Sequence, residues 1–123
     1  MFGKELILDL DSCDYNLITN KENIQKFIDE LCSIHKMNKV GETIYEYFEP
    51  TEFNIKNNIV GYSVIQIISL SSITIHICDI SRNVYLNFFT CGDIKSKETF
   101  NLIKKHFNPI IINKKIVKRG DWI

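Results

Sequence analysis

The 123-residue sequence lacks the features that mark several specialised classes of protein. Its 15 lysines and arginines equal its 15 aspartates and glutamates, so no overall field draws it to nucleic acid or to a membrane surface. The basic run at 114–119 is typical of a solvated strand face. No uncharged apolar run reaches the roughly 18 residues that a membrane-spanning helix needs. Lys4, Glu5 and Asp9 interrupt the start of the chain, where a signal peptide would be apolar. We therefore expect a cytoplasmic protein with no nucleic-acid or membrane partner.

The sequence also lacks any Cys-x-x-Cys pair, although it contains four cysteines. In a reducing cytoplasm we expect Cys13, Cys32, Cys78 and Cys91 to be free thiols. A zinc site built from His76, Cys78 and Cys91 is the alternative. The missing paired motif favours separate roles for these side chains, and we predict no metal.

The pattern of apolar residues predicts one α+β domain over residues 1–123. Alternation and strand-forming residues predict strands over 4–11, 42–48, 61–69, 72–78, 84–90 and 110–118. A helical period predicts helices over 20–36, capped by Asn20, and over 96–107, capped by Ser96. Their buried stripes should hold Ile24, Phe27, Ile28 and Leu31 in the first helix and Phe100, Ile103 and Phe107 in the second.

Residues 49–60 contain the first proline and three asparagines, which predicts a loop. Long parallel crossovers are few, so we expect a two-layer sandwich in which a largely antiparallel sheet carries two helices on one face. The outer face of that sheet should stay partly apolar, and a dimer could cover it.

Reactive side chains recur in and just beyond the strands between residues 61 and 93, namely Ser63, Ser71, His76 and Cys91. Each one alone is typical of a satisfied polar group or a buried thiol. Together they fit a self-cleavage reaction, in which a serine at a strained break between strands attacks the carbonyl of the preceding residue. The amide becomes an ester, a base removes the serine α-proton, and elimination leaves a pyruvoyl group. Donors must stabilise the oxyanion on the way.

Two of these segments, "SSITIH" (71–76) and "FFTCGD" (88–93), resemble the short, bacterial-type S-adenosylmethionine decarboxylases of polyamine biosynthesis. The family segments read "SHISIH" and "FTCGD". The intervals from Ser71 to Ser63, His76 and Cys91 are eight, five and twenty residues, as in the family. The resemblance covers most of the chain and includes Gly3, Leu6, Cys13, Asp14 and "YFEP" at 47–50.

The resemblance implies self-cleavage between Leu70 and Ser71, giving residues 1–70 as the β chain and 71–123 as the α chain. Ser71 would become the pyruvoyl cofactor, the electron sink for decarboxylation of a small substrate of the α-amino-acid type. Ser63 and His76 would serve the processing reaction. Cys91 would protonate the substrate carbon after carbon dioxide leaves. The active form would be a homodimer of processed protomers.

The five-residue interval between Ser71 and His76 carries a geometric condition. Residues an odd number apart face opposite sides of an unbroken strand. We therefore expect a turn or bulge between these two residues, or a chain end created by cleavage.

The chain departs from the family at positions that contact the serine and the nucleoside. The family's glutamate and histidine beside the serine are Leu70 and Ser72 here. Its tryptophan and glutamate, which hold adenine and ribose, are Cys78 and Ile80. Phe48, Tyr47 and Phe53 are candidates for a substitute aromatic platform.

These departures leave the substrate open between two chemical classes. S-adenosylmethionine is the substrate that the resemblance implies, and a basic amino acid such as ornithine or arginine is the alternative. A basic amino acid would need a carboxylate for its distal cation, for which the candidates are Glu46, Glu49, Glu52 and Asp79. A further alternative is an unprocessed, non-catalytic subunit that regulates an active homologue.

Overall fold

The computed structural model describes residues 2–120 of the chain. Its elements in chain order are β1 (Gly3–Asp11), α1 (Tyr15–Ile18), α2 (Lys21–Ile34), β2 (Ile44–Phe48), α3 (Glu52–Lys56), β3 (Gly61–Ile68), β4 (Ser71–Cys78), β5 (Asn83–Thr90), α4 (Ser96–Phe107) and β6 (Ile111–Arg119). The six predicted strands and two predicted long helices are confirmed, each boundary to within two residues.

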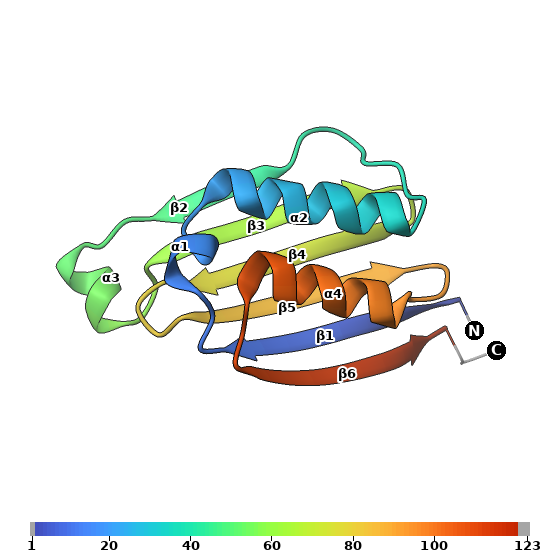
Figure 1. The fold of residues 1–123 in the computed structure, drawn as a ribbon. Helices are drawn as coiled ribbons and strands as arrows, with labels where there is room; N and C mark the ends of the chain where they lie inside the picture. The colour runs from blue at the N-terminus through green and yellow to red at the C-terminus, as the bar shows by residue number, and fades with distance from the viewer. Residues whose placement is uncertain (1, 121–123) are drawn as a thin grey trace.

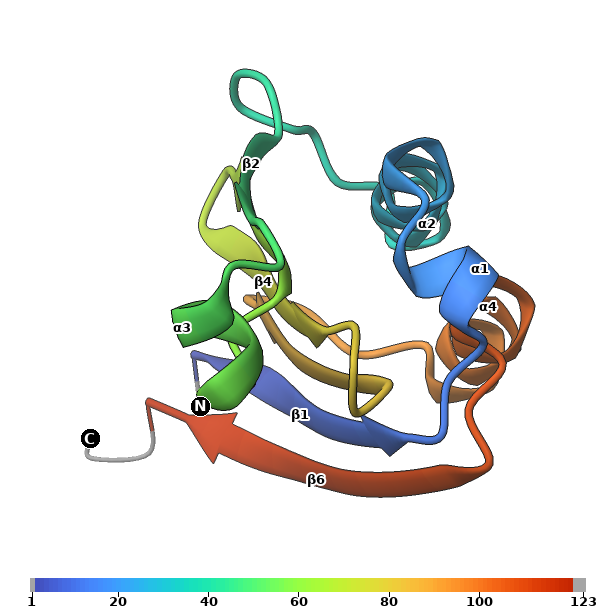
Figure 2. The ribbon, with the colours of Figure 1, turned by 90° about the vertical axis from the view of Figure 1, so that its left-hand side faces the viewer.

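The strands form one sheet in the order β2-β3-β4-β5-β1-β6, and every neighbouring pair is antiparallel. Helices α2 and α4 cover one face of this sheet, and α3 lies beyond the end of β2 on the side away from them (Figures 1 and 2). We call the face under α2 and α4 the inner face and the opposite one the outer face. The predicted α+β two-layer sandwich is therefore confirmed.

Two short helices were not predicted, and one cap was predicted wrongly. Helix α3 occupies the expected loop at 49–60, where the Thr51 side chain accepts a hydrogen bond from the Asn54 N–H. Asn20 caps α2 as predicted. Ser96 does not cap α4, because the cap residue is Lys95, whose side chain makes no capping hydrogen bond. The Lys95 N–H instead donates to the His35 ring from the end of α2.

The core lies between the helices and the inner face. Ile24, Phe27, Ile28 and Leu31 of α2 are fully buried, as the helical period predicted. From α4, Ile103 and Phe107 are fully buried, whereas Phe100 is only partly so. Each buried side chain of this size stabilises the fold by about 1.5–3 kcal/mol.

A buried histidine joins the two long helices. His106 of α4 places Nδ1 2.8 Å from Asn23 Oδ1 and Nε2 3.0 Å from Glu30 Oε2, both on α2. The Asn23 amide nitrogen donates to two backbone carbonyls, so its oxygen is left to accept. The bond between His106 and Glu30 is the main reason that the pKa of the Glu30 carboxyl is lowered, and the Lys105 ion pair adds to it.

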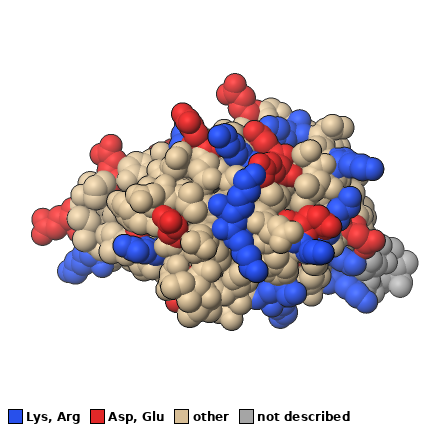
Figure 3. Space-filling model, viewed as in Figure 1, with Lys and Arg blue, Asp and Glu red and all other residues tan. Residues whose placement is uncertain are grey.

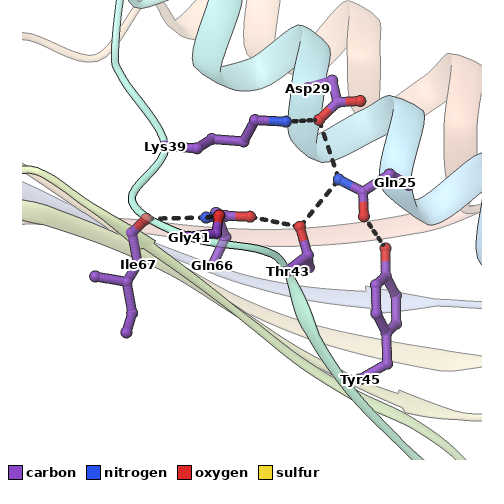
Figure 4. A network of polar contacts seen from close by, with 8 residues as sticks. All are labelled: Gln25, Asp29, Lys39, Gly41, Thr43, Tyr45, Gln66 and Ile67. Atoms are coloured by element: carbon purple, nitrogen blue, oxygen red, sulfur yellow. Dashed lines mark hydrogen bonds and ion pairs between the residues drawn. The ribbon is translucent and has the colours of Figure 1, made fainter.

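A polar network closes the gap between α2 and the β2 edge of the sheet (Figure 4). Gln25 of α2 donates to Thr43 Oγ1 at 3.0 Å and accepts from the Tyr45 hydroxyl at 2.7 Å. Thr43 in turn donates to the side chain of Gln66, which is fully buried in β3. Because every buried polar group of this network has a partner, a polar residue is tolerated in the sheet layer.

Charges of both signs are interspersed over the face that carries α2 and α4 (Figure 3). This distribution agrees with the equal counts of acidic and basic residues. Within residues 2–120, no helix is long and apolar enough to cross a membrane.

Candidate active site

Strands β3 and β4 are joined by a two-residue turn, Ser69 and Leu70, since Ile68 pairs with Ser71. Leu70 adopts φ of 57°, in the left-handed region. An L-residue with a side chain is disfavoured there by roughly 1–2 kcal/mol. The turn lies where the predicted strands over 61–69 and 72–78 meet. It places backbone strain on the residue before Ser71, and the Leu70 side chain is 68% exposed.

Ser71 is the first residue of β4 and faces the inner side with Ile73 and Ile75. It is only 9% exposed, and its Oγ has no hydrogen-bond partner among residues 2–120. A buried hydroxyl without a partner costs about 1–3 kcal/mol. The Ser71 hydroxyl therefore makes no hydrogen bond among the described residues and lies next to the strained Leu70.

A cavity of about 310 Å³ opens beside this hydroxyl, which we call the Ser71 cavity. Ser69, Ser71, Thr90, Cys91 and His35 belong to its lining. It lies where the end of α2, the β3–β4 turn and the segment after β5 converge, at the right-hand end of the molecule in Figure 1. The structure therefore brings Ser71 and Cys91 together, as the proposed chemistry requires.

The segment that carries Cys91 is held by contacts on both sides. The buried Thr90 hydroxyl accepts from the Gly92 N–H at 3.0 Å. Asp93 forms an ion pair with Lys4 of β1, 2.8 Å between Nζ and Oδ1. A side chain at Gly3 would lie 2.2 Å from the Thr90 carbonyl oxygen, so only glycine allows β1 to approach so closely. Cys91 itself is exposed.

Ser63 and His76 form a second group, on the outer face. They are paired across β3 and β4, with Ser63 Oγ 2.9 Å from His76 Nδ1. Glu46 of β2 pairs with Ser63 on one side, and Tyr85 of β5 pairs with His76 on the other. The result is a polar row across a face that also exposes Ile65 and Ile67.

These two groups are separate within one chain. Strand β4 runs unbroken from Ser71 to Cys78, so the expected turn or bulge between Ser71 and His76 is absent, and that branch of the expectation was wrong. The other branch, a chain end created by cleavage, stays a prediction. The two residues face opposite sides of the sheet. Five residues of extended strand separate them by roughly 17 Å. His76 therefore does not reach Ser71 of its own chain.

The candidate substrate residues lie toward the other end of the sheet. Glu46 and Phe48 share the outer face of β2, whereas Tyr47 packs on Tyr62 of the inner face, with ring centroids 4.8 Å apart. Asp79 follows β4 and is only 3% exposed, and its Oδ1 has no partner among the described residues. Burial raises the pKa of Asp79, and the Tyr47 hydroxyl opposes that shift. Asp79 lies beside Tyr47 and beside Gly61, the residue that pairs with Phe48 across β2 and β3.

The other candidates are also placed apart. Glu49 and Glu52 are exposed beside and within α3, as is Phe53. His76 and Cys78 share the outer face of β4, while Cys91 belongs to the Ser71 cavity. Burial raises the pKa of the Cys78 thiol. In the part of the chain that the structure describes, no three histidine, cysteine, aspartate or glutamate side chains are grouped to hold a metal ion.

Sequence reasoning missed two features of the site. Leucine is not a turn residue, so nothing predicted the left-handed Leu70. His35 was assigned to the predicted helix without a role, because its place in the cavity depends on the meeting of α2 and the segment after β5.

Comparison with known proteins supports one family. The family model for S-adenosylmethionine decarboxylase matches residues 4–120. The S-adenosylmethionine decarboxylase proenzyme of Archaeoglobus fulgidus is 28% identical, over 96% of this chain and 97% of its own length. That of Clostridium kluyveri is 27% identical, over 96% of this chain and 86% of its own. The crystal structure of the adenosylmethionine decarboxylase from Aquifex aeolicus superposes with a TM-score of 0.77 at 22% identity, covering 97% of this chain and 91% of that one.

Proposed function

The chain belongs to the S-adenosylmethionine decarboxylase family, and from this premise we propose that it is a proenzyme that cleaves itself between Leu70 and Ser71 and then decarboxylates S-adenosylmethionine. The observation that carries the proposal is the unpartnered Ser71 hydroxyl beside a left-handed Leu70. Strain in the peptide to be broken favours its rearrangement, because the product ester relieves it.

The cleavage needs only protein side chains and water. Ser71 Oγ attacks the Leu70 carbonyl carbon, the carbon–nitrogen bond breaks, and the amide becomes an ester. A base then takes the Ser71 α-proton, and the Leu70 carboxylate leaves as the carbon–oxygen bond breaks. Water hydrolyses the resulting enamine through its imine, which releases ammonia and leaves a pyruvoyl group at position 71. The products are residues 1–70 and 71–123.

We assign the base to His76, oriented by Ser63, of a second copy of the chain. Within one chain the pair lies roughly 17 Å from Ser71 on the opposite face. Two outer faces packed about a two-fold axis, with strands running in opposite directions, would carry each pair to the outer side of the other chain's β3–β4 turn. The Ser71 α-carbon, which bears the proton to be removed, lies there at the first residue of β4, although the Ser71 side chain faces inward. The exposed Ile65 and Ile67 would be buried in such a homodimer.

The Ser71 cavity suits the decarboxylation that follows. A pyruvoyl carbonyl there would bind the substrate amine and accept the electrons left when carbon dioxide departs. The unpartnered oxygen position at Ser71 and the open cavity in front of it leave room for this group. The Cys91 thiol, on the same cavity, delivers the proton to the substrate carbon.

The family relationship favours S-adenosylmethionine over ornithine or arginine, and a catalytic chain over a regulatory subunit. Cys78 and Ile80 provide neither an aromatic ring nor a carboxylate for the nucleoside. Of the aromatic candidates, Phe48 lies on the same face as Ser63 and His76, so we assign the adenine platform to Phe48 and a contact with the substrate to Glu46. We place the reaction in the cytoplasm, where the four free thiols persist.

Intact-mass measurement of the purified chain, followed by carbon dioxide release assays, tests this function. We expect two fragments, the second beginning at position 71 with a blocked terminus, and release from S-adenosylmethionine but not from ornithine or arginine. Ser71→Ala should remain a single chain, while Ser72→Ala, one residue away, should still be cleaved. A single intact chain for aged wild-type protein would overturn the proposal.

A further inference from the structure

His35 lies at the wall of the Ser71 cavity with both of its ring nitrogens engaged. It is the C-cap residue of α2, and its Nδ1 lies 2.9 Å from the Leu31 carbonyl oxygen, so that nitrogen donates. Its Nε2 lies 3.0 Å from the Lys95 backbone nitrogen and accepts that N–H. The partners therefore fix a neutral ring in one tautomer.

The Lys95 bond ties the end of α2 to the segment that carries Cys91. Lys95 is the cap residue of α4, and its side chain makes no capping hydrogen bond, while the Thr99 hydroxyl donates to its carbonyl oxygen and leaves its N–H free for His35. In many helices a glutamate at the third position accepts the cap residue's N–H. Glu98 occupies that position here, yet His35 takes the bond from another helix. The His35 ring also packs edge-on against the buried Phe88 of β5, with centroids 4.9 Å apart.

We propose that His35 is a positioning residue that holds Cys91 at the Ser71 cavity by accepting the Lys95 N–H, and that its protonation releases this segment. The inference rests on the proposed function only in assigning Cys91 as the proton donor. A protonated ring carries a hydrogen on both nitrogens, so Nε2 would face the Lys95 N–H donor to donor. The bond cannot survive that change.

The surroundings of His35 keep it neutral at ordinary pH. Burial lowers the pKa of His35, and the Lys95 cation adds to this, while the Leu31 carbonyl and Glu98 oppose it. The other titratable or charged groups that face it across the cavity and from its own helix end are Lys36, Cys91 and Asp93. Of these, Asp93 is paired with Lys4. The usual pKa of histidine is about 6.5, and the segment should therefore be released only at a pH below that value.

Three proteins test the proposal: wild type, His35→Gln, whose amide oxygen can accept the Lys95 N–H without titrating, and His35→Ala. The first readout is amide hydrogen exchange of Lys95, corrected for intrinsic rates, from pH 5 to 8. Wild type should lose protection toward pH 5, His35→Gln should keep it throughout, and His35→Ala should lack it throughout. Equal protection in wild type and His35→Ala at pH 8 would overturn the proposal.

The second readout is the pH profile of kcat and KM, measured on processed protein. His35→Ala should lower kcat by about tenfold to a hundredfold at pH 8 with KM little changed, because a misplaced proton donor slows the chemical step. His35→Gln should retain most of kcat and lose the acidic fall that wild type shows. An acidic fall of the same size in His35→Gln would overturn the role of protonation. The mass of the two fragments checks cleavage separately, so a failure of the proposed function is distinguishable from a failure of this inference.

Discussion

Ser63 and His76 face each other across β3 and β4, with Ser63 Oγ 2.9 Å from His76 Nδ1, on the side of the sheet opposite to Ser71. If His76 is the base, as we propose, it must act on another chain rather than its own. His76→Ala expressed alone should therefore remain uncleaved or be cleaved about 10²–10⁴-fold more slowly. Coexpressed with Ser71→Ala, the His76→Ala chain should be cut, because its intact Ser71 meets the partner's intact His76.

Mass spectrometry of differently tagged chains reads this out. Only the chain that retains Ser71 should yield fragments. A Ser71→Ala/His76→Ala double variant in place of the Ser71→Ala partner is the matched control, and it should give no rescue. Cleavage of His76→Ala at the wild-type rate without any partner would remove His76 from the reaction.

Leu70 is held in a backbone conformation that glycine adopts freely. Leu70→Gly should relieve roughly 1–2 kcal/mol of strain from the uncleaved chain. If the transition state releases that strain, cleavage should slow by about fivefold to thirtyfold. The rate is measured by pulse labelling and mass spectrometry of freshly made protein.

Arg82 provides the control for this change. It has a φ of 58°, nearly the same as Leu70, but lies in the β4–β5 connection at the other end of the sheet. Arg82→Gly should relax a similar strain without altering the cleavage rate. Equal slowing in both variants would mean that general stability, rather than strain at the broken peptide, sets the rate.

Cys91 shares the Ser71 cavity and is exposed, so its thiol can serve turnover without serving cleavage. Cys91→Ser should be processed normally but lose about 10²–10⁴-fold in turnover, because a hydroxyl is a much weaker acid than a thiol. Carbon dioxide release by the processed variant measures the loss. Cys13→Ala removes a buried thiol, whose pKa burial raises to about 12, and should leave turnover unchanged. Full activity of Cys91→Ser would return Cys91 to an ordinary surface residue.

The Glu30–His106 contact predicts a pH dependence of stability. The pKa of Glu30 is lowered in the folded protein, first by the His106 bond and then by Lys105. A lowered pKa stabilises the fold above the unfolded value, about 4.3, and that contribution is lost as the pH falls through the folded value. Glu30→Gln should reduce the free energy of unfolding by about 1 kcal/mol at pH 7, since Glu30 is partly exposed and its interactions are screened.

Urea unfolding at pH 7, 5 and 3 checks this result. Between pH 5 and 3 wild type should lose more stability than Glu30→Gln. Glu42→Gln, which changes an exposed loop carboxylate, should follow wild type at each pH. If wild type and Glu30→Gln lose the same free energy of unfolding between pH 5 and 3, the Glu30–His106 contact contributes nothing to stability.

Periodic features of the sequence predicted the fold well. The stripe from Ile24 to Leu31 and the alternation in β4 each depend on local repeats, which a single sequence displays. The intervals among Ser63, Ser71, His76 and Cys91 match the family pattern, and the chemical roles of these four side chains stay predictions. What failed depended on distant contacts. Ser96 was predicted to cap α4, whereas the cap residue is Lys95, whose N–H donates to His35, 60 residues away in the sequence.

The sequence also did not predict that the candidate site residues lie on two opposite faces of the sheet. The odd interval between Ser71 and His76 raised the conflict, but the sequence offered only a turn or bulge, or a chain end created by cleavage, to resolve it. The unbroken β4 removes the bulge. A strained leucine could not be foreseen either, because the turn is held by sheet pairing on both sides rather than by its own residues.

The strand order determines how the molecule behaves after it is cut. Cleavage at Leu70 would assign β1, β2 and β3 to one polypeptide and β4, β5 and β6 to the other. In the sheet, β1 lies between β5 and β6, and β3 borders β4, so three ladders of hydrogen bonds join the two polypeptides. The fragments would remain associated without a covalent link. Before cleavage, refolding is a unimolecular event. Afterwards refolding is a bimolecular assembly of two fragments whose strands alternate in one sheet. The midpoint of the unfolding transition then depends on protein concentration. The chain would therefore have to fold before it matures, and an unfolded mature enzyme would return to activity poorly when dilute.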